Sequence, residues 1–135
     1  MVRQWAISIR QPYVECIVAG VKAYEIRTRI PERLSVGDEV YVVQTGSGGE
    51  VVMSFVLEDI ICDAPEKLWE KFMLSLCIQE KDFYLYAAGR TCIYLLKVGA
   101  KQVFGPHLML SDLGLAYAPQ WFTQLRIPHS APSCI

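Results

Sequence analysis

The sequence predicts an α/β (α+β) fold in which about six mainly antiparallel strands form a small twisted β-barrel with two to three helices. Three observations support this prediction. Several short segments alternate apolar with polar or small residues, as half-buried strands do. The glycine-rich segment 46–49 separates two of these segments, as a hairpin turn would. Apolar residues at helical spacing are confined to a few short stretches.

The expected elements follow one another along the chain with short connections. Strands are expected at 4–10, 23–29, 38–44, 50–61, 91–104 and 122–127, and helices at 11–20, from 64–66 onward and at 79–87. Pro12 lies in the first turn of the first helix, where its missing N–H costs nothing. Gly20 is suited to end that helix.

Length and composition favour one folded domain. The chain has 135 residues, 53% of them hydrophobic, which suits a single core and argues against disorder. We expect one domain over 1–127 and a flexible tail at 128–135. No apolar run reaches the roughly 20 residues that span a bilayer, and the N-terminus does not resemble a signal peptide. A cytoplasmic protein without membrane contact is therefore expected.

Charge and cysteine content exclude some classes of function. The acidic middle, residues 34–82, has three basic and ten acidic groups, and each flanking region has an excess of three basic groups. With a net charge of −1, the chain lacks the basic field of a duplex-wrapping protein, and a nucleotide or short strand is the better ligand. The five cysteines form no C-x-x-C pair, so reduced, mostly buried thiols are expected. The two histidines do not have metal-ligand spacing, and we expect no metal and no cofactor.

Polar side chains gather around the first expected helix. Arg10 and Gln11 stand at its start, and Lys22, Glu25 and Arg27 follow its end. A small domain seldom needs so many hydrogen-bonding groups in so short a stretch merely to fold. The stretch therefore predicts one wall of a ligand pocket.

Each of these residues also has a simpler structural interpretation. Lys22 could be a solvated cation at a helix C-terminus, which contributes roughly 0.3–1 kcal/mol. Glu25 and Arg27 share a strand face and could form an exposed salt bridge worth about 0–1 kcal/mol. Arg10 and Gln11 could serve only as polar groups at the start of the helix.

The order of these motifs resembles the ASCH domain family of the PUA-like superfamily. Arg-Gln-Pro-Tyr at 10–13 is followed by Gly-x-Lys-x-x-Glu-x-Arg at 20–27, which is similar to the family signature. Further similar segments are 86–90, 104–106, 110–114 and 118–122, the last with Ala118 and Trp121 as departures. The resemblance covers roughly residues 4–127 and implies a PUA-like barrel.

The resemblance implies a cleft that binds RNA or a modified nucleoside. The expected ligand-binding residues are Arg10, Gln11, Tyr13, Lys22, Glu25, Arg27, Tyr86 and Gln120. Arginine and lysine can hold phosphate or carbonyl oxygens, and Gln11 and Glu25 can read a base edge. Tyr13, Tyr86 and Trp121 are the candidates for stacking on a base.

A metal-independent hydrolase is the alternative function. Some small ASCH proteins are amidohydrolases that act on N4-acetylcytidine with a lysine, a threonine and a glutamate, and others are linked to RNA cleavage. Lys22 matches the lysine, Glu25 replaces the threonine, and Glu66 or Glu70 could supply the acidic group. Lys22 and Glu25 are the catalytic candidates if the chain is an enzyme. Glu25 is expected to hold Lys22 protonated, which opposes this chemistry.

A third hypothesis is an interaction domain. The acidic middle of the chain would then dock a protein partner within a transcription or translation complex.

Overall fold

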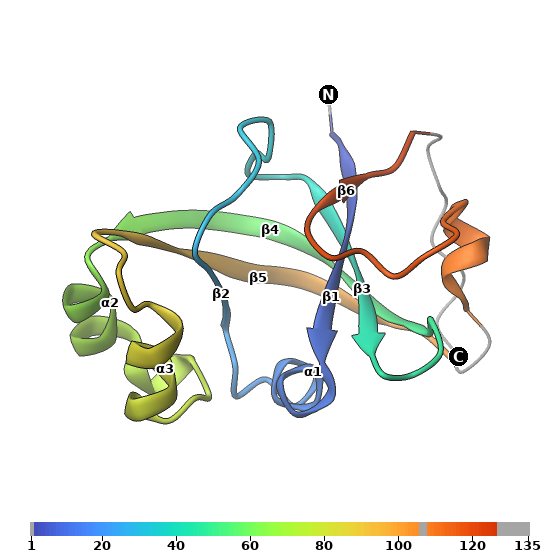
Figure 1. The fold of residues 1–135 in the computed structure, drawn as a ribbon. Helices are drawn as coiled ribbons and strands as arrows, with labels where there is room; N and C mark the ends of the chain where they lie inside the picture. The colour runs from blue at the N-terminus through green and yellow to red at the C-terminus, as the bar shows by residue number, and fades with distance from the viewer. Residues whose placement is uncertain (1, 106–107, 127–135) are drawn as a thin grey trace.

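The structure is a computed structural model and describes residues 2–105 and 108–126 (Figure 1). The strands are β1 (Gln4–Arg10), β2 (Tyr24–Arg27), β3 (Glu39–Thr45), β4 (Val51–Asp63), β5 (Ile93–Val103) and β6 (Thr123–Gln124). The helices are α1 (Gln11–Val18), α2 (Pro65–Phe72) and α3 (Glu80–Tyr86), with short 3-10 turns η1 (Met73–Ser75) and η2 (Leu110–Leu113). The segment 128–135, predicted to be flexible, lies outside the described residues, as do both histidines.

All six strands belong to one mixed sheet in the order β2-β5-β4-β3-β1-β6. β1 runs parallel to β3, and the other neighbouring strands are antiparallel. The predicted α+β class and the six mainly antiparallel strands are thus confirmed, and the first strand, β1, pairs with the last, β6.

The predicted closure into a barrel is wrong, because β2 and β6 are edge strands. β1 and β2 face each other without forming a ladder. A side chain spans the gap instead: Arg27 Nη2 donates a hydrogen bond of 3.0 Å to the Ser8 carbonyl. Alternation along a strand indicates which face is buried, but it does not indicate whether the two edges of a sheet pair with each other.

The buried apolar residues that the structure describes form three clusters, and two of these include residues of α-helices. Ile17 of α1 packs with Ile7, Val42 and Phe55 of the sheet. At the far end of β2 and β5, the helices α2 and α3 form a cap, where Leu68, Leu76 and Phe83 pack with Leu95 (Figure 1).

The end of α1 positions the start of the Gly-x-Lys-x-x-Glu-x-Arg motif at 20–27. The helix ends at Val18, two residues before the predicted end, and Gly20 then takes a left-handed φ of 82° that favours glycine. The Cys16 carbonyl accepts hydrogen bonds of 3.0 Å from the backbone N–H groups of both Val21 and Lys22. These bonds hold the backbone of Lys22 against the last turn of α1.

The prediction of reduced, mostly buried cysteines is wrong for the four cysteines that the structure describes; Cys134 lies outside the described residues. Cys16 of α1 and Cys77, between η1 and α3, form a disulfide. Cys62 and Cys92 have free thiols and are exposed. A sequence separation of 61 residues between the bonded cysteines gives no local signal for the pair.

A candidate ligand-binding pocket

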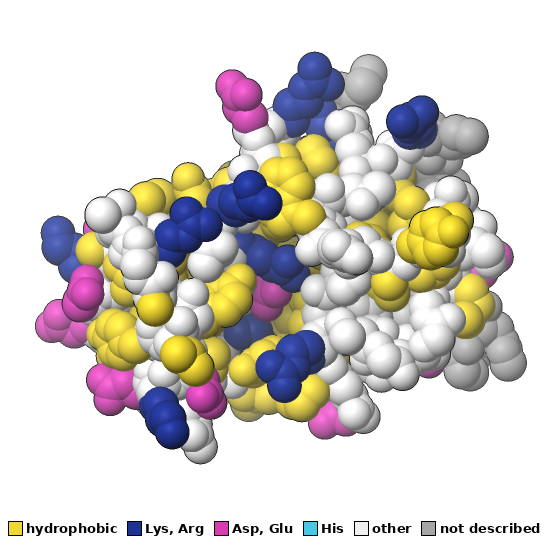
Figure 2. Space-filling view, viewed as in Figure 1, with side chains coloured by type: hydrophobic (Ala, Val, Ile, Leu, Met, Phe, Trp, Pro, Cys, Tyr) yellow, Lys and Arg dark blue, Asp and Glu magenta, His cyan; other side chains and the backbone are white. Residues whose placement is uncertain are grey.

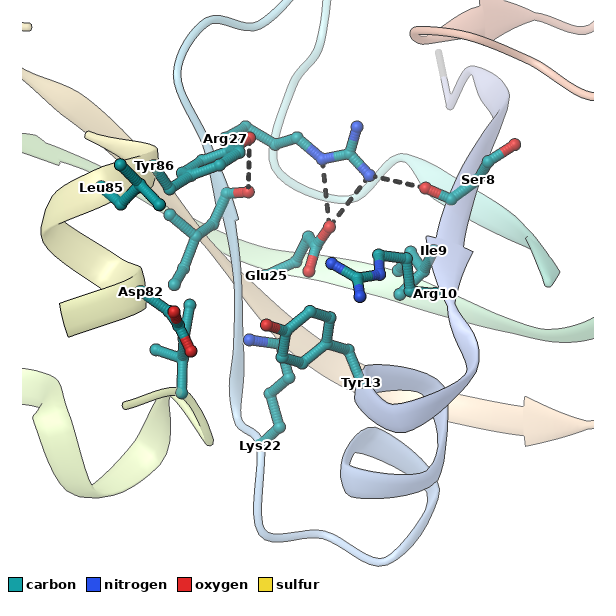
Figure 3. A pocket seen from close by; sticks show the side chains of 12 residues that line it. Ser8, Ile9, Arg10, Tyr13, Lys22, Glu25, Arg27, Asp82, Leu85 and Tyr86 are labelled. Atoms are coloured by element: carbon teal, nitrogen blue, oxygen red, sulfur yellow. Dashed lines mark hydrogen bonds and ion pairs between the residues drawn. The ribbon is translucent and has the colours of Figure 1, made fainter. Parts of the chain in front are cut away.

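A cavity of about 600 Å³ lies between β1, α1 and β2 on one side and residues 78–86 on the other (Figure 3). Its lining residues are Ser8, Ile9, Arg10, Tyr13, Lys22, Glu25, Ile26, Arg27, Ile78, Asp82, Leu85 and Tyr86. Figure 2 shows a hollow on this face with basic and acidic side chains inside it. The cavity occupies the gap between β1 and β2 that a closed barrel would have sealed.

Glu25 and Arg27 form a largely buried ion pair. They are two positions apart on β2 and therefore project from the same face, as predicted. Arg27 Nη2 lies 2.9 Å from Glu25 Oε2, and Arg27 Nε donates to the same oxygen at 3.1 Å. The two side chains are only 14% and 9% exposed, for arginine and glutamate respectively, so the pair is not the exposed salt bridge of the simpler interpretation.

Lys22 is buried beside this pair. It is 3% exposed, and its Nζ donates a hydrogen bond of 2.7 Å to the Leu76 carbonyl, so it is not a solvated capping residue. Burial lowers the pKa of Lys22 from its ordinary value; Glu25 raises that pKa in part, and Arg27 lowers it further. Glu25 thus acts on the pKa of Lys22 in the expected direction, but the net shift is downward because the loss of solvation outweighs the attraction of one carboxylate.

Two cationic side chains lie near the ring of Tyr13 at the α1 side of the cavity. Lys22 Nζ is 5.1 Å from the centre of the Tyr13 ring, and Arg10 Cζ is 5.9 Å from it. Arg10 is exposed at the end of β1. An aromatic face and a solvent-accessible guanidinium are therefore adjacent at the rim.

The opposite side of the cavity comes from α3. The Tyr86 hydroxyl donates a hydrogen bond of 3.3 Å to the Ile26 carbonyl, and burial raises the pKa of Tyr86. Asp82 and Leu85 precede Tyr86 on the same helix and project toward the cavity (Figure 3).

Six of the eight predicted ligand-binding residues line this cavity, and two lie elsewhere. Gln11 is exposed, and its Nε2 donates a 3.1 Å hydrogen bond to Glu15 Oε1. Gln120 borders a second hollow, on the other side of β1. The ligand-binding role of all eight stays a prediction.

Sequence reasoning missed several lining residues, among them Ser8, Ile78 and Asp82. Asp82 had a usable signal, because it precedes Tyr86 by four residues and thus lies on the same helical face. Among the acidic residues of the middle region, 34–82, Asp82 lines the cavity. Glu66 and Glu70, the candidates named from the sequence, lie on α2 and do not line it.

Neither a metal centre nor a membrane helix is found in the described part of the chain. Within residues 2–105 and 108–126, no three His, Cys, Asp or Glu side chains are grouped so that they could hold a metal ion. Over the same ranges, no helix has the length and apolar character to cross a bilayer.

Comparison with known proteins identifies the family. The model of the ASCH domain matches residues 7–103, which is more than half of the chain. The chain belongs to the ASCH domain family. This family is linked to RNA binding, which supports RNA binding at that coarse level.

Solved structures of ASCH proteins share the fold. The crystal structure of ASCH from Zymomonas mobilis has a TM-score of 0.82 and 24% identity, and the match covers 91% of this chain and 87% of that one. A single-residue variant of the same Zymomonas mobilis protein matches with a TM-score of 0.82 and 23% identity over 91% and 90% of the two chains. At these identities the likeness shows the fold alone. Among curated proteins, none matches the chain significantly.

Proposed function

We propose that the pocket between β1, α1, β2 and α3 binds one nucleoside or nucleotide unit of RNA. The observation that carries this proposal is the group of Lys22 and Glu25, both buried, and the largely buried Arg27, beside the ring of Tyr13 in a cavity of about 600 Å³. A volume within about 300–1,000 Å³ is typical of small-ligand sites. Buried, hydrogen-bonded polar groups are held in place before a ligand arrives, which lowers the entropic cost of binding.

The lining residues match the parts of a nucleotide. Arg10 is exposed and can form charge-assisted hydrogen bonds with a phosphate. The Tyr13 and Tyr86 rings can stack on a base. The Glu25 carboxylate accepts and the Lys22 ammonium donates hydrogen bonds, so together they can read a base edge.

Binding is tested with purified protein and a panel of the four common nucleosides, their 5′-monophosphates and N4-acetylcytidine, by isothermal titration calorimetry. We expect binding by the wild type and a loss of about tenfold or more in Lys22→Met and Arg10→Ala, since each removes a charged hydrogen-bond donor. Arg10 is exposed, so Arg10→Ala should fold normally. It therefore still tests the site if the buried substitution Lys22→Met prevents folding. Lys67→Met, which removes an exposed lysine from α2, is the matched control. Equal affinities for all four proteins would refute the proposed site.

Hydrolysis of an acylated nucleoside is the second candidate function, and the lowered pKa of Lys22 favours it. An amine is a nucleophile or base only without its proton, and burial increases the unprotonated fraction at a given pH. In the reaction, water adds to the acetyl carbonyl of N4-acetylcytidine, the C–N bond breaks, and cytidine and acetate leave.

Turnover separates the two candidates. The wild type, Lys22→Met and Glu25→Thr are incubated with N4-acetylcytidine, and cytidine is measured by chromatography. Cytidine formation that Lys22→Met abolishes would establish the hydrolase. If N4-acetylcytidine binds and is recovered unchanged from the wild type, the protein is a binding module for this ligand. Activity that appears only in Glu25→Thr would show that the carboxylate blocks the reaction.

A further inference from the structure

A second hollow lies on the other side of β1, with a volume of about 710 Å³. We call it the outer hollow; its lining is Ser8, Gln44, Thr45, Gly46, Gly48, Gly49, Leu110, Ala116, Tyr117, Ala118, Pro119 and Gln120. Ser8 borders both cavities. Its carbonyl accepts the hydrogen bond from Arg27 in the pocket, while its hydroxyl points away and donates a 2.6 Å bond to the Pro119 carbonyl (Figure 3). Only the width of β1 therefore separates the pocket from the outer hollow.

The two cavities differ in their chemistry. Five charged side chains line the pocket, whereas none of the residues that line the outer hollow is charged. The outer hollow has the amides of Gln44 and Gln120 and the hydroxyl of Thr45, which can bond the edge of any base. Tyr117 is 86% exposed there, so its ring is accessible for stacking. A neutral hollow with amides and an open aromatic ring suits a base, and not a phosphate.

One exposed arginine lines the pocket, and another contacts the residue that follows Gln120 of the outer hollow. Arg10 follows Ser8 by two positions on β1, lines the pocket and is exposed. Arg29 is also exposed, and its guanidinium lies 5.0 Å from the ring centre of Trp121, the residue after Gln120. Two accessible guanidinium groups are therefore available to pair with the phosphates of an RNA strand that crosses β1.

We infer that the ligand of this protein is single-stranded RNA of at least two nucleotides, with one base in the pocket and its neighbour in the outer hollow. This inference rests on the proposed nucleotide binding by the pocket and specifies the ligand further. Duplex RNA is excluded from this arrangement, because its bases stay stacked and paired and cannot separate across a strand. The role of Gln120 then differs from that of Lys22: Gln120 contacts the second nucleotide.

The test compares ribonucleoside 5′-monophosphates with the corresponding 5′-phosphorylated ribodinucleotides, for all four bases, by isothermal titration calorimetry. The variants are Tyr117→Ala, which removes the ring, and Tyr117→Phe, which keeps it. Leu74→Ala is the control, because Leu74 is 91% exposed on η1 and lines neither cavity. Tyr117 is itself so exposed that neither variant should disturb the fold.

We expect the wild type to bind at least one dinucleotide more tightly than its monophosphate. Since stacking of a base on an aromatic ring is worth a factor of about 5 to 150 in affinity, Tyr117→Ala should lose that factor for the dinucleotide. It should leave monophosphate affinity within about twofold, and Tyr117→Phe and Leu74→Ala should match the wild type for both ligands.

Two other results separate this inference from the proposed function. If monophosphates bind in a Lys22-dependent manner but dinucleotides bind no tighter, the pocket is a nucleotide site and the outer hollow is not a subsite. If neither ligand class binds, the proposed function fails, and this inference fails with it. Equal losses of affinity for both ligands in Tyr117→Ala would also overturn the inference. A contact to the second nucleotide should not change the affinity for a monophosphate, which occupies only the pocket.

Discussion

The two walls of the pocket differ in chemistry. We call residues 8–27 the motif wall and residues 76–86 the cap wall. The motif wall contributes the buried Lys22 and Glu25 and the largely buried Arg27, which are paired with one another or with backbone carbonyls. The cap wall contributes Ile78 and the exposed side chains of residues 82, 85 and 86. One wall thus holds preorganised charges, and the other encloses them.

Few bonds join the two walls. Among them are the disulfide between Cys16 and Cys77, the Lys22 hydrogen bond to the Leu76 carbonyl, and the 3.3 Å hydrogen bond from the Tyr86 hydroxyl to the Ile26 carbonyl. Just before the cap wall, the Ala23 N–H donates a 2.9 Å hydrogen bond to the Ser75 carbonyl. The motif wall therefore determines which charged groups the ligand meets. The bonds between the walls determine how closely the cap wall approaches those groups.

The largest effect is expected from removal of the disulfide, in a variant with both Cys16→Ser and Cys77→Ser. A crosslink between residues 61 positions apart restricts the unfolded chain, and its loss should cost about 4 kcal/mol of unfolding free energy in the chain-entropy description. Urea denaturation without reductant measures this. Wild type treated with a dithiol reductant should behave like the variant. If reduction leaves the urea midpoint unchanged, the cap wall does not depend on this crosslink.

The next largest effect concerns the charges of the motif wall. Glu25→Gln leaves the Arg27 guanidinium mostly buried without a negative partner, which should cost about 3 kcal/mol of unfolding free energy. The matched control is Glu58→Gln, which breaks the exposed Glu58–Lys97 pair. Thermal denaturation should show a fall of several degrees in Tm for Glu25→Gln and little change for the control. Similar Tm values for the two variants would mean that the burial of the motif-wall ion pair adds nothing to the stability of the protein.

A smaller, pH-dependent effect is expected from Lys22. Because its pKa is lowered in the folded protein, the unfolded chain binds more protons between that lowered value and the ordinary value of 10.5. Stability rises with pH wherever the unfolded state binds more protons. The unfolding free energy of the wild type should therefore increase relative to that of Lys22→Met as pH rises through this window, and the difference should be constant at lower pH. Urea denaturation of both proteins from pH 6 to 10 measures it, and a falling difference would contradict burial as the dominant cause.

Sequence reasoning reached the motif wall because its residues are close in the chain. Glu25 and Arg27 are two positions apart on a strand, and Lys22 follows a helix that ends near Gly20, so local rules bring them together. The cap wall lies about 50 residues later and is positioned by the packing of Leu76 and Phe83, for which no local pattern gives a partner. The same limit explains why the disulfide and the open sheet were not predicted, because each depends on contacts between segments that are distant in the sequence. The net pKa shift of Lys22 likewise depends on burial, which neighbouring residues do not reveal.

The smallest effect is expected at the cap wall. Tyr86→Phe removes a hydroxyl whose hydrogen bond to the Ile26 carbonyl is long, at 3.3 Å, and water can replace it because Tyr86 is half exposed. The loss of unfolding free energy should be about 0.5 kcal/mol or less. Nucleotide affinity should stay within about twofold of wild type, since the ring that stacks on the base remains, whereas Tyr86→Ala should lose about fivefold or more.

Calorimetric titration of the wild type and both Tyr86 variants with the tightest-binding nucleotide measures this difference, and thermal denaturation checks their folding. Leu74→Ala again serves as the exposed control. If Tyr86→Phe loses as much affinity as Tyr86→Ala, the hydroxyl and not the ring is what the ligand meets. The cap wall would then supply hydrogen bonds of its own, and the division between a wall that recognises the ligand and a wall that encloses it would fail.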